Sequence, residues 1–347
     1  MSNLRATIEY RYTGAMHKVL SLLLVGVLSM FFAEVVSGAS QIWFFSLFPL
    51  IITFPLYLAH AIFLFSIALY LRRISLAGLY FFGVLFGLYE ALITKVLWGG
   101  YLNEPNVALG TVLGVGPVEF SALVFFWHPV MSFIVPLLVY QVLTGNVFTS
   151  HRRILHRTRR RMTILAVVAI ILGSFIANGN QFNPISVVVS VGGTILIIYG
   201  LIRVTTLKTI NEIQMTRRGL IISGIYLIVL YSATFFFIRP ELIPVTLTPY
   251  LTIGVWYLIG VHYVKRSSQI DSGTSTVSND LYSRKDLLQL LSVLVASAVI
   301  WSFVPEIAQL VLALGYIGIV IAGIILFFSA VRSLQHTHAA VVGTQTQ

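Results

Sequence analysis

Long apolar stretches constrain this chain more than any other feature. Ten stretches of about 18 or more residues are apolar enough to cross a ~30 Å hydrocarbon core as α-helices. The sequence therefore predicts an all-α fold, a polytopic bundle of about ten transmembrane helices. The predicted spans cover residues 19–38, 50–71, 76–98, 118–143, 163–179, 185–204, 220–238, 247–264, 287–304 and 307–331.

The composition supports a lipid environment. Apolar residues make up 58% of the 347 residues and charged residues 10%, whereas soluble domains carry about 25% charged residues. One core could not hide this much apolar surface, so a water-soluble globule is excluded. The chain has no cysteine, which excludes disulfides, thiolate metal sites and thiol catalysis.

The basic residues indicate how the chain crosses the membrane. Of the 22 Lys and Arg residues, 20 fall in the N-terminal segment, the even-numbered loops and the C-terminal tail, and only Lys95 and Arg239 lie at or near the other side. Cytosolic loops of membrane proteins carry an excess of Lys and Arg. The sequence therefore predicts a multi-pass protein of the cell membrane with both termini in the cytosol. This distribution accounts for the net charge of +11 without a nucleic-acid partner.

The densest basic segment is His151–Arg161, which holds six arginines. It can act as a stop that sets topology, or it can bind anionic lipid headgroups at about 1 kcal/mol per cation. A partner in a membrane complex is a further option. The arginines concerned are Arg152, Arg153, Arg157, Arg159, Arg160 and Arg161.

Composition divides the chain into four parts. Residues 1–145 form a four-helix part that carries the intramembrane polar residues, and residues 146–266 hold the apolar helices five to eight. Residues 267–286, rich in Ser, Thr, Asp and Gly, are predicted to be a flexible cytosolic linker. Residues 287–347 form a helical hairpin and a disordered tail.

Four titratable side chains fall inside the first four spans. A charge at the bilayer centre costs at least about 2.5–3.5 kcal/mol, so each such residue needs a reason. At ~1.5 Å per residue, Glu34 and Glu90 lie roughly 21 Å from the cytosolic edge, and His60 and His128 lie about 14–15 Å from the outer edge. We expect them to form one polar site open to the extracytosolic side, in which Glu34, His60, Glu90, Thr94 and His128 bind a substrate or ion. The alternative is that each glutamate is protonated and hydrogen-bonds a neighbouring helix as structural support.

Neighbouring residues define the limits of this expected site. Gly83 and Gly87 have the GxxxG spacing of close helix packing, on the helix face that continues into Glu90. Lys95 lies off that face, and we expect its side chain to extend to the outer interface. Glu119 is nine residues before His128, about 180° around the helix, and is not placed in the site.

Three segments carry a resemblance to known families. FFAEVVSG (Phe31–Gly38), GLYEALITK (Gly87–Lys95) and FFWHP (Phe125–Pro129) resemble a group of uncharacterised multi-pass membrane proteins with a glutamate-serine-glycine signature. The order of glutamate and later histidine is also similar to the CAAX-protease and bacteriocin-processing family. That similarity implies Glu90 and His128 as catalytic residues, although Tyr89 stands where the family has its first glutamate.

Three functions remain open. The preferred one is a transporter or permease with a buried glutamate–histidine site, because ten helices leave almost no mass outside the membrane. The second is a membrane-embedded hydrolase in which Glu90 activates a water and His128 assists. The third is a structural subunit of a membrane (respiratory) complex, in which His60 and His128 could ligate a b-type haem. The same Glu and His groups could instead hold a metal, so the cofactor is left open.

Overall fold

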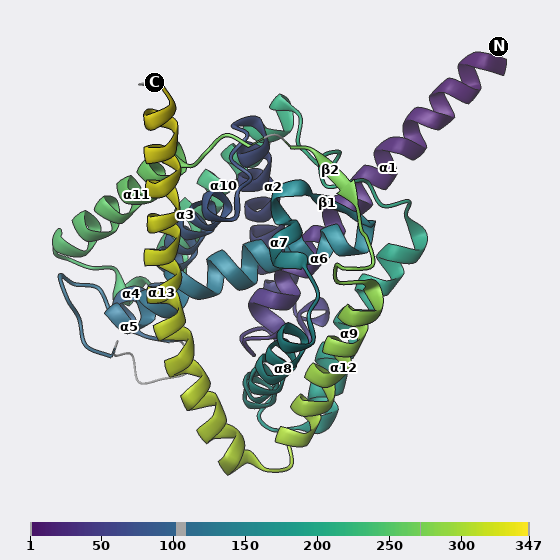
Figure 1. The fold of residues 1–347 in the computed structure, drawn as a ribbon. Helices are drawn as coiled ribbons and strands as arrows, with labels where there is room; N and C mark the ends of the chain where they lie inside the picture. The colour runs from purple at the N-terminus through teal and green to yellow at the C-terminus, as the bar shows by residue number, and fades with distance from the viewer. Residues whose placement is uncertain (1, 102–108, 271, 346–347) are drawn as a thin grey trace. The chain divides into compact units, whose positions relative to one another are not determined.

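The computed structural model describes residues 2–101, 109–270 and 272–345, and for residues 2–13 and 336–345 it describes the backbone alone. Helices make up most of the described chain (Figure 1), which confirms the all-α fold. The elements are α1 (Ser2–Met30), η1 (Phe31–Val35), η2 (Trp43–Phe45), η3 (Pro49–Thr53), α2 (Phe54–Tyr70), α3 (Leu76–Thr94), α4 (Val96–Gly99), α5 (Pro117–Phe120), η4 (Ser121–Ile134), α6 (Val135–Thr144), β1 (Asn146–Phe148), η5 (Thr149–His151), α7 (Arg152–Leu155), α8 (Arg159–Gly179), α9 (Pro184–Val204), α10 (Arg217–Phe237), η6 (Pro240–Leu242), α11 (Thr248–Arg266), β2 (Thr274–Thr276), α12 (Arg284–Trp301) and α13 (Pro305–Gln345).

Eight helical stretches in the described chain are long and apolar enough to cross a membrane, judged by length and composition. They are Gly14–Val35, Pro49–Tyr70, Leu76–Thr94, Pro117–Thr144, Arg159–Gly179, Pro184–Val204, Arg217–Phe237 and Pro305–Gln335.

The other two predicted spans, 247–264 and 287–304, correspond to the helices α11 and α12. These two helices are not among the eight, so the number of candidate spans is lower than predicted. The physical reason is charge at one end of each helix: α12 begins with Arg284, Lys285 and Asp286, and α11 ends in Lys265 and Arg266.

Local sequence signals set where several helices begin. The side chains of Thr158, Asn183, Thr216 and Ser283 each accept hydrogen bonds from backbone N–H groups in the first turn of α8, α9, α10 and α12. Such caps satisfy donors that have no partner inside the helix. Pro184 follows its cap directly, at a position where proline costs no hydrogen bond.

The chain folds as two compact units, and each is built from separated segments. Unit 1 contains Met1–Ile62, Pro136–Met215 and Gly273–Leu312, and unit 2 contains Phe63–Val135, Thr216–Ser272 and Ala313–Gln347. These two units are defined by contacts between residues. The four-part division of the sequence is based on composition, and it stays a prediction.

In unit 1, α8 packs against α12 and α9, and α9 packs against α1. Glycines make these approaches close. A Cβ atom on Gly179 would lie 2.3 Å from the Cα of Gly38, and one on Gly173 would lie 2.3 Å from the Oγ of Ser297. Gly38 also has a φ of +78°, a conformation that favours glycine.

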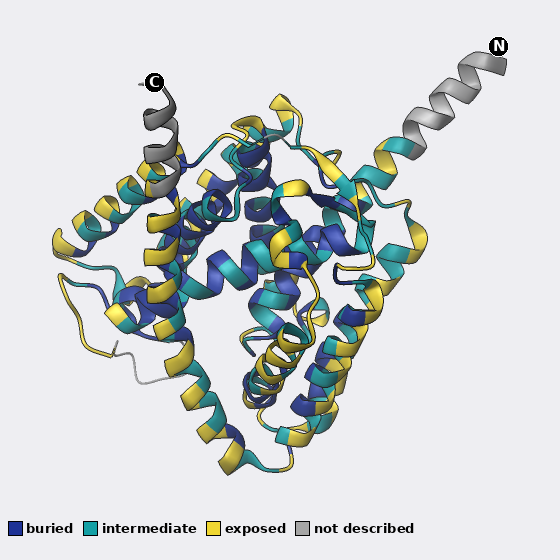
Figure 2. Cartoon of the chain, viewed as in Figure 1, coloured by how far each residue is buried: buried dark blue, intermediate teal, exposed yellow. Residues whose placement is uncertain are grey.

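In unit 2, α3 is the central helix and packs against η4, α10 and α11. A Cβ atom on Gly83 would lie 2.4 Å from the Cα of Pro129, and one on Gly87 would lie 3.0 Å from the Cα of Val124. The GxxxG face of α3 therefore packs directly on η4, as its spacing predicts. Figure 2 shows the contrast between the largely buried α3 and α13, whose exposed residues include Leu310, Leu314 and Phe328. Exposed apolar side chains on α13 suit a lipid-facing helix.

The predicted flexible linker, residues 267–286, is held to unit 1 through its second half. Strand β2 pairs antiparallel with β1, with Val147 opposite Ser275, and an isolated bridge joins His156 to Leu281. Leu281 and Tyr282 join a small apolar cluster with Val142, Val147 and Leu155. Composition did not predict this arrangement, because the apolar residues that anchor the segment are few, Val277, Leu281 and Tyr282, and follow a run of Ser, Thr and Gly.

Candidate functional site

An imidazole and a carboxylate meet inside unit 2. The Nε2 atom of His128 lies 2.8 Å from Oε2 of Glu90, and the two side chains are 2% and 15% exposed. Glu90 comes from α3 and His128 from η4, both within stretches long and apolar enough to span a membrane. The close packing of Gly83 and Gly87 on η4 brings the two helices near enough for this contact.

The backbone around His128 has an unusual form. Residues Ser121–Ile134 form a π-helix with Pro129 inside it. Proline has no N–H to donate, and π-helical turns occur frequently at functional sites, where they displace side chains from the α-helical positions. The Nδ1 atom of His128 lies 3.2 Å from Oγ of Ser132, and the imidazole ring is tilted against Phe86 at a centroid distance of 5.4 Å. Each ring nitrogen of His128 therefore has a polar neighbour.

Thr94, one turn after Glu90, serves the helix backbone. Its hydroxyl donates to the carbonyl oxygens of Glu90 at 3.1 Å and Ala91 at 3.4 Å. These bonds lie in the last turn of α3. The binding role predicted for Thr94 stays a prediction.

Glu34 has its own hydrogen-bond partners in unit 1. The hydroxyl of Tyr57 donates to its Oε1 and the hydroxyl of Ser40 donates to its Oε2, both at 2.6 Å. Glu34 lies in a second π-helical turn, η1, just before the close contact of Gly38 with Gly179. Both carboxylate oxygens thus accept short hydrogen bonds.

His60 also belongs to unit 1, where its ring is buried and its Nδ1 lies 2.9 Å from the carbonyl oxygen of Leu56. Among the predicted site residues, the structure thus joins Glu90 to His128 within unit 2 and places Glu34 and His60 in unit 1. The single site of all four residues stays a prediction.

The expectation that Lys95 extends to the outer interface is wrong. Lys95 is fully buried, and its ammonium donates to the carbonyl oxygens of Ile93, Phe235 and Ile238. It also lies 4.7 Å from the centroid of the Phe235 ring. The reason is that α10 ends at Phe237 and leaves carbonyl groups without helical partners, which a lysine can satisfy.

Two further charged side chains of unit 2 form hydrogen bonds with backbone groups outside the long helices. Arg239 donates to the carbonyl oxygens of Gly99 at 3.0 Å and Gly100 at 2.8 Å. Glu119 is buried, and its Oε1 accepts the backbone N–H of Leu109 at 2.8 Å. Arg239 and Lys95 are the two cations that the charge distribution of the sequence sets apart from the other 20, but that distribution does not predict their carbonyl partners.

No group of three or more His, Cys, Asp or Glu side chains in the described residues could hold a metal ion. The arrangement in unit 2 is a two-residue acid–base pair. Such a pair can bind, hold and release a proton, or exchange a proton for a cation.

Comparison with known proteins identifies the family of this chain. The chain is 37% identical over 143 residues to an uncharacterised protein of Archaeoglobus fulgidus, and the match covers 41% of this chain and 43% of that relative. The aligned region thus spans less than half the length of that relative. No solved structure gives a significant match. Residues 23–341 match an uncharacterised membrane protein family, and the chain belongs to that family.

Proposed function

We propose that this multi-pass membrane protein is a proton-linked transporter or permease, in which Glu90 and His128 form the ion-binding pair. The observation that carries the proposal is the 2.8 Å contact between His128 Nε2 and Glu90 Oε2 inside two membrane-spanning stretches. Ionisable residues at such depth are expensive and mark ion pathways and proton relays in membrane proteins.

The chemistry follows from the two groups. With His128 protonated and Glu90 ionised, the pair is neutral as a unit and its charges satisfy each other. A cation that approaches Glu90 competes with the imidazolium and favours loss of the His128 proton. Because His128 lies on a π-helix beside Pro129, a change of helical register can move the imidazole relative to Glu90. Such a movement couples proton release to a rearrangement of η4 against α3.

The orientation belongs to the same proposal. The excess of cations supports both termini in the cytosol of a cell-membrane protein, which would put Glu90 in the outer half of the bilayer, open to the extracytosolic side. Since the chain has no cysteine, single-cysteine variants can be labelled cleanly. In intact cells, an impermeant maleimide should label Val112→Cys, at an exposed position, and should label Asn279→Cys only after lysis. The opposite pattern would reverse the orientation.

The transport proposal is tested in proteoliposomes with an imposed pH gradient and an internal pH dye. We expect the gradient to dissipate when Na⁺, K⁺ or the organic cation tetraphenylphosphonium is added to the wild type. Glu90→Gln should abolish the response, and Glu306→Gln, which removes an exposed carboxylate, should preserve it. If Glu90→Gln and Glu34→Gln both behave as the wild type, the transporter assignment fails.

A hydrolase is the second function that the same contact favours, because a carboxylate and an imidazole at 2.8 Å are a general acid–base pair. It is the activity implied by the resemblance to CAAX proteases. Cleavage of prenylated or short apolar peptides by the wild type, lost in His128→Ala while the melting temperature is kept, would favour the hydrolase over the transporter.

Haem binding is less favoured, since both ring nitrogens of His128 already have polar neighbours in Glu90 and Ser132. A haem iron would have to displace one of them. A visible absorption spectrum of the purified protein with a Soret band would overturn this argument.

A further inference from the structure

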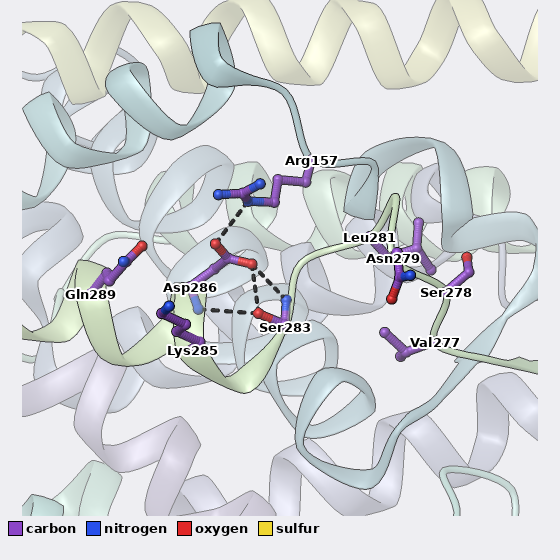
Figure 3. Close-up of a pocket in the computed structure, with 9 residues that line it drawn as sticks. All are labelled: Arg157, Val277, Ser278, Asn279, Leu281, Ser283, Lys285, Asp286 and Gln289. Carbon is purple, nitrogen blue, oxygen red and sulfur yellow. Dashed lines mark hydrogen bonds and ion pairs between the residues drawn. The ribbon is translucent and has the colours of Figure 1, made fainter.

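The arginine-rich segment before α8 lines two cavities in unit 1, and they differ in how their charges are used. Figure 3 shows the first, of about 340 Å³, which is lined by Arg157 together with residues of the segment 277–289. There Arg157 Nε donates to Oδ1 of Asp286 at 2.8 Å, and Oδ2 of Asp286 accepts the N–H and hydroxyl of Ser283 at 2.9 and 2.7 Å. The charge of Arg157 is thus neutralised within the protein.

The second cavity, also of about 340 Å³, has a strongly basic lining. Three guanidinium groups and one imidazole face it, against a single carboxylate. Its lining residues are Arg152, Arg153, His156, Thr158, Arg161 and Asp280. Of these, Arg152 is occupied: it donates to the hydroxyls of Ser275 at 3.1 Å and Ser278 at 2.6 Å and lies 3.5 Å from Asp280.

The other basic groups of this cavity keep donors available. Nη1 of Arg161 donates to the carbonyl oxygens of Arg153 at 2.8 Å and His156 at 2.9 Å, which fixes the guanidinium at the cavity wall. The side chains of Arg153 and His156 have no hydrogen-bond or ion-pair partner among the residues that the structure describes. Basic donors that outnumber the single carboxylate of the cavity are suited to an anion.

The position of the cavity beside the first turn of α8 adds to this excess of positive charge. Residues Arg159–Arg161 form the first turn of α8, which contains no acidic residue. The N-terminal end of a helix carries partial positive charge and repels cations there. A bound anion would offset both this repulsion and the mutual repulsion of the arginines.

We propose that this cavity, which we call the Arg161 pocket, binds a phosphate monoester group through Arg153, His156 and Arg161. A phosphate offers several acceptor oxygens and close to two negative charges, which matches the donors that remain available. The proposal narrows the earlier set of six arginines, because Arg157 is paired with Asp286 and neither Arg159 nor Arg160 lines the pocket. It is independent of the transport function proposed for Glu90 and His128.

The group could belong to a lipid headgroup or to a phosphate compound of the cytosol, and binding measurements distinguish the two. The purified full chain in a neutral detergent is titrated by microscale thermophoresis with dioctanoyl phosphatidic acid and, separately, with inorganic phosphate at constant ionic strength. Saturable binding of phosphatidic acid at least tenfold tighter than that of phosphate identifies a lipid. Equal affinities identify a soluble phosphate compound.

Three variants separate a pocket from diffuse attraction by charge. Arg153→Gln and Arg161→Gln should each weaken binding about tenfold or more, as expected for the loss of a hydrogen bond to a charged group. Arg160→Gln removes the same charge from an exposed position outside the pocket and should change the affinity less than threefold. Arg153, whose side chain is exposed, keeps the test valid if Arg161→Gln fails to fold. Absence of binding by the wild type, or equal effects of Arg160→Gln and Arg153→Gln, would overturn the proposal.

Discussion

At the scale of residues, the polar groups inside this chain fall into two kinds. Glu90 and His128 satisfy each other across two helices, whereas Lys95 and Arg239 satisfy backbone carbonyl groups where helices end. The first kind joins two side chains between which we propose that a proton is exchanged. In the second kind, the hydrogen bonds of the cation go to the backbone, so the cation contributes to the stability of the fold.

Replacement of Lys95 tests this second role. Lys95→Met removes the donor to three carbonyl oxygens, and its contact with Ile93 is buried while those with Phe235 and Ile238 are partly buried. An unsatisfied buried group costs about 1–3 kcal/mol. We expect a melting temperature in detergent, followed by tryptophan fluorescence, that is clearly below the wild type. Lys265→Met, at an exposed position of α11, is the matched control. If both variants melt at the same temperature, Lys95 does not cap α10.

Asp286 provides a test by pH. Burial alone would raise its pKa, but hydrogen bonds from Ser283 and the contact with Arg157 outweigh burial and hold the pKa below its ordinary value. A carboxylate with a lowered pKa contributes stability above its unfolded pKa of about 3.9, and the contribution is lost as pH falls through the folded pKa. Asp286→Asn also removes half of a capping box, and a lost cap costs about 0.5–2 kcal/mol.

The expected outcome is therefore a lower melting temperature for Asp286→Asn at pH 7, with a difference from the wild type that starts to shrink near about pH 4 and is lost as the pH falls through the lowered pKa of Asp286. Melting curves between pH 3 and pH 7 measure it, where the detergent-solubilised protein stays soluble. Glu306→Gln, at an exposed carboxylate, should show no such trend. A difference that persists unchanged at low pH would show that the charge of Asp286 contributes nothing.

At the scale of elements, the packing of α3 on η4 determines whether Glu90 can reach His128. Gly83→Ala would place a methyl group 2.4 Å from the Cα of Pro129, so the helices must move apart. We expect loss of stability and loss of the proton-linked activity together. Gly192→Ala on α9, where nothing lies within 4 Å of the added carbon, should instead keep or raise stability by up to about 1 kcal/mol. If Gly83→Ala keeps wild-type activity, the function of the Glu90–His128 pair does not depend on this packing.

The elements also show what sequence periodicity can predict. All ten predicted spans correspond to helices, because apolar length is a strong signal, and the GxxxG spacing correctly identified the face of α3 that meets η4. The π-helical turns that carry Glu34 and His128 were not predicted. A π-turn adds one residue without changing composition, so the stripes counted at α-helical spacing shift around the helix at those points.

The candidate site was predictable in part for the same reason. Depth along a helix follows from counting residues, and this counting grouped Glu90 and His128 with Glu34 and His60; the contact confirms proximity only for Glu90 and His128. Hydrogen-bond partners such as Ser40 for Glu34 depend on how the chain turns after η1, which residue spacing does not describe. The commitment of Lys95 to α10 depends on a helix about 140 residues away in sequence, beyond any local pattern.

At the scale of the whole molecule, each unit is assembled from three separate segments of the chain. Gly38 from the first segment of unit 1 meets Gly179 from the second, and Gly173 from the second meets Ser297 from the third. Unit 1 therefore closes its core only after α12 has been synthesised. A fragment that ends between these segments lacks the partners of its own helices.

This interleaving predicts how fragments behave. Residues 1–145 alone lack α8, α9 and α12, so the apolar faces around Gly38 and α1 stay uncovered, and we expect aggregation in size-exclusion chromatography in detergent. Co-expression of residues 1–145 with residues 146–347 should recover a single complex, because both units are then complete and the break falls in the tight turn at Gly145. A monodisperse, cooperatively melting 1–145 fragment would instead support the four-part division by composition. The comparison thus decides whether the part that carries Glu34 and Glu90 is a folding unit or requires the later helices to form its core.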